Sequence, residues 1–119
     1  MTDNDKRRFT RVPFDAEVVL HHGGRTWSSD LIDVSIKGML TAAPAGFDVA
    51  LGESLGVDLI LNEEVSIDTR CTLVHCTSER LGMRIDRIDM ESIMHLRRLL
   101  ELNLGDPALL ERELSGLHD

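Results

Sequence analysis

The sequence predicts a mainly β protein, a six-stranded antiparallel β-barrel with α-helices packed on it after the last strand. Three observations lead to this prediction. Short segments of alternating apolar and polar residues recur from Phe14 onward, tight-turn residues separate them, and the apolar spacing becomes helical after Asp89. Short antiparallel strands joined by tight turns favour a closed barrel, because closure leaves no unpaired strand edge.

The first strand is expected at residues 14–20, where every second residue is apolar. Gly23-Gly24 then marks a hairpin turn. The other five strands are expected at 25–33, 38–42, 55–61, 65–74 and 81–85. Glycine and proline recur in residues 43–54, which indicates a connecting loop between the third and fourth strands.

Two helices are expected after the barrel. Asp89 is a good N-cap and Gly105 a good helix end, so the first helix should lie between them. Asp106-Pro107 supplies a second cap, and the second short helix has leucines on one face, at Leu110, Leu114 and Leu117. We therefore expect a flexible basic arm at 1–8 and one domain at 9–119, with the barrel at about 12–86 and the helical tail at about 89–117.

Composition argues against several classes of function. The formal net charge of −8 argues against general nucleic-acid binding. No apolar stretch approaches the roughly 20 residues that span a bilayer. The polar start of the chain lacks the apolar core of a secretory signal. A cytoplasmic protein without membrane insertion is therefore expected.

No metal ion, cofactor or catalytic centre is expected. Cys71 and Cys76 lie five residues apart in one expected strand, which places them on opposite faces and predicts two reduced thiols. The histidines and acids show no metal-ligand spacing. Ser35 does not lie in a Gly-x-Ser-x-Gly turn, so the pattern does not favour a hydrolase. We expect a binding protein and not an enzyme.

A basic cluster precedes the first strand. Lys6, Arg7, Arg8 and Arg11 are four of the thirteen basic residues and lie within six positions. A guanidinium offers a planar fork of donors that fits phosphate oxygens, guanine O6 and N7, or the face of a purine. On an acidic chain this cluster predicts a local anion site; a solvated basic terminus is the alternative.

A second motif, Asp33-x-Ser35-x-x-Gly38, joins two expected strands. In an extended chain Asp33 and Ser35 project from the same face. A carboxylate can accept hydrogen bonds from guanine N1–H and N2–H₂, a hydroxyl can bond a phosphate, and glycine permits close ligand approach. The alternative is a strand-end turn in which Asp33 and Ser35 bond only local backbone groups.

Together, Arg-x-x-x-Arg at 7–11 and Asp-x-Ser-x-x-Gly at 33–38 resemble the paired motifs of the PilZ domain family. The resemblance extends to the strand pattern, to Leu81-Gly82-Met83-Arg84-Ile85, which is similar to the last barrel strand of that family, and to the helical tail of its single-domain members. It implies a six-stranded antiparallel barrel that binds the bacterial second messenger cyclic di-GMP.

The resemblance also implies roles for the basic cluster. Arg7 and Arg11 would grip phosphates and guanine edges, and Arg8 would add a further contact or stack. In this family the residue before the first motif arginine influences whether one ligand or a stacked pair binds. Lys6 stands there, and its positive charge would tolerate the phosphates of a pair.

Asp33, Ser35 and Gly38 would form the second half of the site, on the barrel surface. Some relatives also place an aromatic ring on the strand before the last turn, against a guanine. Alignment on Leu81-Gly82 puts His75 at that position. His75 would stack on the base, or else it is a half-exposed strand histidine.

The function expected from the resemblance is that of a receptor or adaptor, in which cyclic di-GMP drives a conformational change that an unidentified protein partner detects. The first alternative is a PilZ-like protein–protein interaction module that does not bind nucleotide. Nucleic-acid binding through the basic arm is disfavoured, because the chain is acidic and has no Tyr, three Phe and one Trp.

Overall fold

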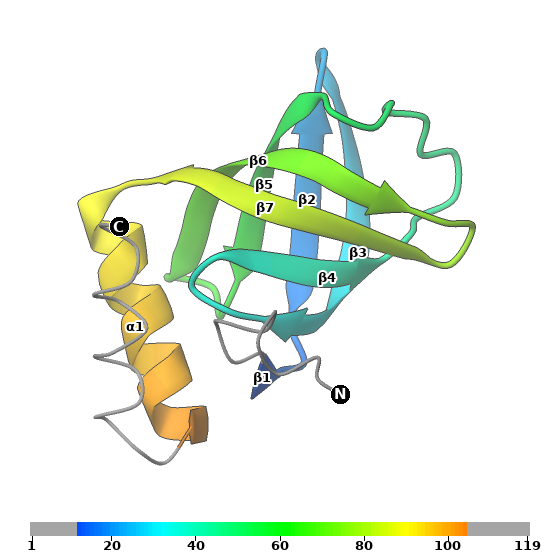
Figure 1. Ribbon diagram of the computed structural model, residues 1–119. Coiled ribbons are helices and arrows are strands. Elements are labelled where there is room, and N and C mark those ends of the chain that lie inside the picture. The colour runs from blue at the N-terminus through cyan, green and yellow to red at the C-terminus, as the bar shows by residue number, and fades with distance from the viewer. Residues whose placement is uncertain (1–11, 105–119) are drawn as a thin grey trace.

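The computed structural model describes residues 12–104 (Figure 1). Along the chain the elements are β1 (Val12–Pro13), β2 (Glu17–His22), β3 (Arg25–Val34), β4 (Gly38–Ala42), β5 (Ser54–Ile60), β6 (Ser66–Cys76), β7 (Arg80–Ile88) and α1 (Met90–Leu104). The expected arm at 1–8, the basic residues Lys6, Arg7, Arg8 and Arg11, and the expected second helix all lie outside the described residues.

The strands β2 to β7 form one closed antiparallel ring in the order β3-β2-β5-β6-β7-β4, and β3 closes it by pairing with β4 (Figure 1). The predicted six-stranded barrel is therefore confirmed. β1 is an additional short strand that continues the line of β2 along the same edge of β3. The intervening residues keep that line, since the Phe14 amide donates to the Ile32 carbonyl at 3.4 Å and the Leu31 amide donates to the Ala16 carbonyl at 2.9 Å.

The barrel interior is filled by aliphatic side chains from the inward faces of all six ring strands. The largest fully buried ones on the strands are Leu20, Met39, Leu55, Leu59, Ile67, Leu73 and Leu81. Trp27 and Phe47 pack edge to face at 5.0 Å between ring centroids, beside this core. The apolar half of the alternating pattern thus becomes the core, and the polar half faces outward.

A β-bulge in β3 decides which way Asp33 faces. Leu31 pairs with Thr41 on β4, but Asp33 pairs with Leu40, so one extra residue of β3 is accommodated between these pairs. Leu31 and Val34 are both buried although they are three residues apart, whereas Asp33 is only partly buried. Without the bulge, strict alternation from Leu31 would turn the Asp33 carboxylate into the core.

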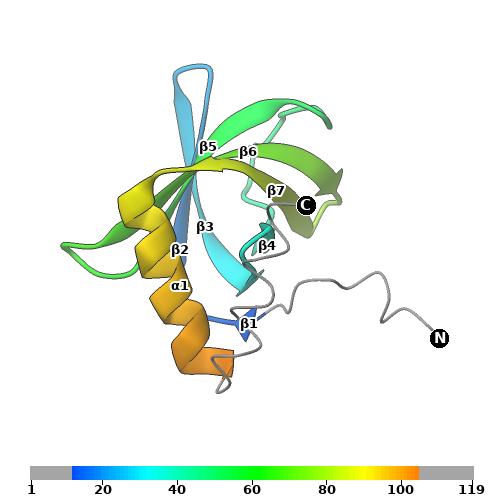
Figure 2. The ribbon, with the colours of Figure 1, turned by 60° about the vertical axis from the view of Figure 1, so that its left-hand side comes forward.

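Helix α1 packs beside the barrel, against β6 and β1 (Figure 2). The Asp89 carboxylate accepts a hydrogen bond from the Ser92 amide at 2.7 Å, which confirms the predicted N-cap. Leu96, Leu99 and Leu100 bury the inner face of the helix. No helix among residues 12–104 is both long and apolar enough to cross a membrane.

The two thiols are free, as predicted, but the reason given for it is wrong. Cys71 is buried and Cys76 is exposed. A register shift between Leu73 and His75 adds one residue to β6, so Cys71 and Cys76 pair with residues on the same face of β7, Ile85 and Leu81. The thiols are therefore kept apart by their distance along the strand and not by opposite orientation.

Candidate functional site

Four residues on adjacent strands, each paired with the next, form a row across the outside of the barrel. Asp33 on β3 pairs with Leu40 on β4, Leu40 pairs with Gly82 on β7, and Gly82 pairs with His75 on β6. Directly paired residues project from the same face of a sheet. Two of the predicted site residues, Asp33 and His75, therefore lie on one face, about 14 Å apart across three strand spacings.

The floor between them is low and apolar. Leu40 is partly buried, and Gly82 has no side chain. A Cβ added at Gly82 would come within 3.0 Å of the Cβ of His75, so glycine lets the histidine lie close over β7. The His75 side chain is exposed. This part of the face can accept a flat ring between a carboxylate and an imidazole.

The turn at one end of the row is stabilised by Ser35. Its hydroxyl accepts hydrogen bonds from the Lys37 and Gly38 amides at 3.1 and 3.2 Å, and the Ser35 amide donates to the Gly38 carbonyl at 2.8 Å. Ser35 is 5% exposed. Ser35 thus performs the local backbone role that the sequence left open as an alternative.

Gly38 has a steric reason to be glycine. A Cβ at this position would collide with the backbone carbonyl of Met83 on β7. The close approach lets the turn join the sheet: the Ile85 amide donates to the Lys37 carbonyl at 2.8 Å. Gly38 therefore sets the position of Lys37 and Ser35 relative to β7.

Two arginines on β7 that were not among the predicted site residues lie beside Gly82. Arg80 pairs with Ala42 and Arg84 with Gly38, and both are exposed. Arg80, Gly82 and Arg84 alternate along the strand, so they share the outward face. The signal was present in the sequence, as basic residues at every second position around a glycine on the last strand.

Asp86 holds Arg84 in place. The Arg84 Nε donates to Asp86 Oδ1 at 2.9 Å, and the Thr72 hydroxyl donates to Asp86 Oδ2 at 2.5 Å. The hydrogen bond from Thr72, and then that from Arg84, lower the pKa of the Asp86 carboxyl below its usual value. An anionic ligand that approaches Arg84 would therefore compete with an ionised carboxylate.

The opposite wall of the barrel is acidic. Outward-facing carboxylates gather on β2, β5, β6 and the first half of β3, at Glu17, Asp58, Asp68 and Asp30. The charge of this chain is thus unevenly distributed: Arg80 and Arg84 flank the Asp33–His75 row, whereas the far side carries these four acids and one exposed arginine, Arg70. A locally basic face is therefore compatible with a net charge of −8.

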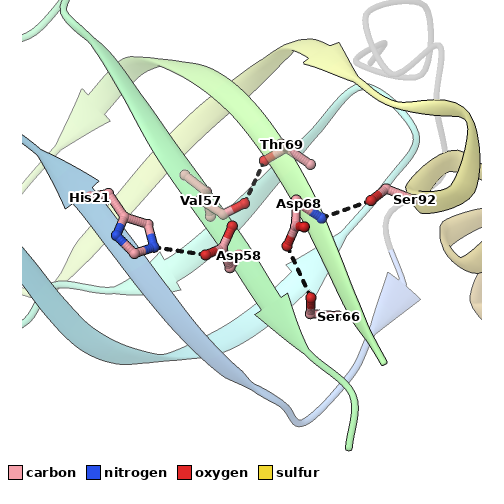
Figure 3. Close-up of polar contacts among 7 residues, drawn as sticks. All are labelled: His21, Val57, Asp58, Ser66, Asp68, Thr69 and Ser92. Carbon is pink, nitrogen blue, oxygen red and sulfur yellow. Dashed lines mark hydrogen bonds and ion pairs between the residues drawn. The ribbon is translucent and has the colours of Figure 1, made fainter. Parts of the chain in front are cut away.

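Asp58 on this wall has a network of its own (Figure 3). His21 Nε2 lies 2.7 Å from Asp58 Oδ2, and Asp58 pairs directly with Asp68 across the strands. Burial raises the pKa of the Asp58 carboxyl, and Asp68 adds to the rise, while the contact with His21 acts against it. No group of three or more His, Cys, Asp or Glu side chains within residues 12–104 is arranged to hold a metal ion.

The described chain begins beside the Asp33–Gly38 turn. Val12 pairs with Val34 and Pro13 pairs with Asp33, in antiparallel register. The predicted contacts of Lys6, Arg7, Arg8 and Arg11 lie outside the described residues, so they stay predictions.

A model of the PilZ domain matches residues 5–102 of the chain. Among solved structures, the PilZ domain of YcgR from Escherichia coli with c-di-GMP superimposes with a TM-score of 0.66 at 18% identity, covering 96% of this chain and 98% of that one. MotI (DgrA) of Bacillus subtilis, an inhibitor of motility, also gives 0.66 at 17% identity. The match covers 80% of this chain, which spans about half the length of MotI, 52%.

The PilZ domain of CeSA, from a cellulose-synthesizing bacterium, gives a TM-score of 0.62 at 11% identity, covering 81% of this chain and 96% of that one. At these identities the structural likeness concerns the fold alone. The family model covers most of the chain, including both sequence motifs and the whole barrel. This chain belongs to the PilZ domain family.

Proposed function

We propose that this protein is a cyclic di-GMP receptor whose site is the outer face that runs from Asp33 to His75. The observation that supports this most is the pairing of Val12 with Val34. It brings the start of the described chain, and therefore the attachment point of the basic cluster, to the Asp33–Gly38 turn. The PilZ domain of YcgR, with the same fold, was solved with c-di-GMP.

Covalent geometry limits how far the basic cluster can lie from this turn. The Cα of Arg11 must lie about 3.8 Å from that of Val12, and the Cα of Arg7 no more than about 18 Å from it. An arginine side chain adds several ångströms of reach. Both motif arginines can therefore reach a ligand on the Asp33–His75 face without any change in the barrel.

Each group on the face has a distinct role in the proposal. The Asp33 carboxylate accepts hydrogen bonds from N1–H and N2–H₂ of one guanine, which selects guanine over adenine. Arg7, Arg8 and Arg11 bind phosphates and the Hoogsteen edge of the base. His75 stacks on a guanine above Gly82, and Lys6 offsets the phosphate charge of a second, stacked ligand.

The binding energy requires several of these contacts at once. Ordering about five residues of the arm costs roughly 5–10 kcal/mol, and micromolar affinity requires about −8 kcal/mol net. The gross interaction must then approach 15 kcal/mol. Charge-assisted hydrogen bonds supply about 1.5–3 kcal/mol each, so five or six of them with base stacking suffice, whereas one or two do not.

The competing function is a PilZ interaction module that binds no nucleotide. The local bonds of Ser35 are compatible with either function. The presence of Arg80 and Arg84 on the same face as Asp33 favours the receptor, because a fold-only role does not require basic side chains there. The family's domains act in binding and as adaptors, which agrees with a receptor that has no catalytic step.

An NMR titration of the ¹⁵N-labelled full chain separates the two functions. With cyclic di-GMP, a receptor shows shifts in the amides of residues 33–38 and of Leu40, Gly82 and His75. Cyclic di-AMP is the matched control, since adenine lacks the donor pair that Asp33 accepts. No shifts with cyclic di-GMP, or equal shifts with both nucleotides, would contradict the proposal.

A further inference from the structure

A second concave surface lies away from the Asp33–His75 face, between α1 and the loop that joins β5 to β6. This groove has a volume of about 410 Å³. Its lining is predominantly apolar, and the apolar residues are Phe14, Leu61, Val65, Leu99 and Leu102. On α1, Leu102 is 73% exposed, whereas its neighbour Leu99, one turn earlier, is 5% exposed. Large apolar side chains that remain exposed beside a groove are typical of a docking surface.

The α1 side of the groove has helical periodicity. His95, Arg98, Leu99 and Leu102 stand at positions i, i+3, i+4 and i+7 and line one stripe of the helix. A stripe of this spacing accepts the apolar ridge of another helix. The geometry therefore favours a helical peptide segment over a flat surface or a compact small molecule.

On the α1 side, the rim of the groove carries a cation, whereas the β5–β6 loop carries the exposed acids Glu63 and Glu64. Arg98 is exposed and has no ion-pair partner among residues 12–104. The neighbouring acid Glu101 is engaged by Arg97 Nε at 3.3 Å, and Glu91 lies 3.8 Å from His95. A cation left without a partner on the edge of an apolar groove is complementary to an acidic residue on the segment that docks there.

We infer that the groove between α1 and the β5–β6 loop binds a short amphipathic helix of a partner protein, with leucine-like side chains on its apolar stripe and an acidic residue that meets Arg98. Phe14 connects this surface to the proposed nucleotide face, because it follows Pro13, the residue paired with Asp33. The inference does not rest on cyclic di-GMP binding, since none of the residues proposed to contact the nucleotide lines the groove.

The test uses two synthetic fourteen-residue peptides with the same leucines at i, i+3, i+4 and i+7, one flanked by glutamates and the other by lysines. The net charge of −8 attracts the lysine peptide to the protein as a whole. Tighter binding of the glutamate peptide than of the lysine peptide would therefore have to come from a local contact, because the overall charge acts against it. By fluorescence anisotropy the full chain should bind the glutamate peptide about tenfold more tightly, and Arg98→Glu should reverse the order.

Two exposed apolar residues of α1 give a matched pair of variants. Leu102→Ser should weaken binding of the glutamate peptide about fivefold or more, whereas Met90→Ser, at a position 78% exposed and outside the groove, should leave it within about twofold. Both side chains are exposed, so neither change should disturb folding. Methyl NMR should locate the peptide through shifts of Leu61, Val65 and Leu99.

Other outcomes would overturn the inference. Equal binding of the two peptides, or peptide-induced NMR shifts elsewhere on the barrel, would show that the groove is not a specific site for an acidic helix. Groove shifts that follow protein concentration would identify a second copy as the occupant. If the Leu114→Ser substitution alone shifts the methyl signals of Leu61 and Val65 relative to wild type, and neither peptide shifts them, the occupant of the groove is the chain's own C-terminal segment. Loss of cyclic di-GMP binding alone leaves the docking result unaffected, so the two proposals fail separately.

Discussion

Gly82 and His75 face one another across β7 and β6, and a methyl group added at Gly82 would come within 3.0 Å of the His75 Cβ. That contact is tighter than ordinary packing, and the histidine Cβ is fixed by its own backbone. The glycine thus lets His75 lie close over β7 at the centre of the Asp33–His75 row, and this relationship leads to the first prediction.

Gly82→Ala should fold but lose about 1 kcal/mol or more of stability, because β6 and β7 must separate slightly. Its affinity for cyclic di-GMP should fall at least about tenfold, since the methyl occupies the floor of the proposed site. Gly56→Ala is the control: its Cβ meets His21 at an ordinary 3.5 Å on the opposite wall. Calorimetry and thermal melts measure both. Equal nucleotide affinity in the two variants would move the site away from Gly82.

Asp86→Asn should strengthen nucleotide binding about two- to fivefold, because it releases the exposed Arg84 from an ion pair of less than about 1 kcal/mol. The gain should shrink as salt is added. Asp48→Asn is the matched control, since it releases Arg25, an arginine of similar exposure at the β2–β3 hairpin, from an ion pair with a more exposed acid. If both variants gain equally, the effect comes from net charge and not from Arg84.

The two thiols should differ in reactivity. Burial raises the pKa of Cys71 to about 11, so the thiol is neutral at pH 8 as well as inaccessible. A disulfide reagent at pH 8 should modify one thiol rapidly in the native protein and two in guanidinium chloride. Cys76→Ser should abolish the rapid phase. Rapid modification of Cys71 in the native protein would show that the barrel opens at β6 more readily than its packing implies.

Asp58→Asn should raise the melting temperature at pH 7. The folded state raises the pKa of this carboxyl, so the folded protein binds the proton more tightly than the unfolded chain. Stability then falls as pH rises from the unfolded pKa through the folded one, and the ionised group remains unfavourable above that window. The gain should be about 1–3 °C at pH 7 and vanish near pH 3.

Asp30→Asn serves as the control for this comparison, since it removes an exposed acid from the same wall. A gain at Asp30 as large as that at Asp58 would indicate relief of general charge repulsion. A loss of stability in Asp58→Asn at neutral pH would mean that its contact with His21 outweighs the cost of burial.

The strands and the helix cap could be predicted because their signals are local. Alternation of apolar residues, β-branched content and turn residues together identified all six ring strands, and Asp89 identified the start of α1. The limits of β7 were underestimated: it extends to Ile88, beyond the expected end at Ile85. A register shift between Arg70 and Cys71 interrupts the simple pairing at that end of the strand.

Bulges explain the features that sequence spacing could not provide. Alternation assigns faces by parity, and one extra residue reverses the parity for the rest of the strand. This is why Cys76 was assigned to the wrong face. Nothing local in the sequence marks a bulge in β3 or β6, because the extra residue is tolerated only by pairing with a distant strand.

The candidate site was predicted in part. Asp33 and His75 were named from motif and alignment, and the sheet register brings them onto one face. The contribution of Arg80 and Arg84 depends on which strand lies beside the turn, which is a property of the closed ring. The pairing of β4 with β7 places the two arginines beside the turn, and residue spacing within either segment does not reveal that pairing.

Calorimetry of the full chain with cyclic di-GMP tests the central claim most directly, with Arg11→Ala and Asp33→Ala beside it. The account predicts micromolar binding of two ligands per chain, and a loss of at least about tenfold in affinity for each variant while the circular dichroism spectrum is retained. Arg25→Ala, a basic residue remote from the turn, should bind as the wild type does. No binding heat for the wild type, or unchanged affinity in Arg11→Ala or Asp33→Ala, would contradict it.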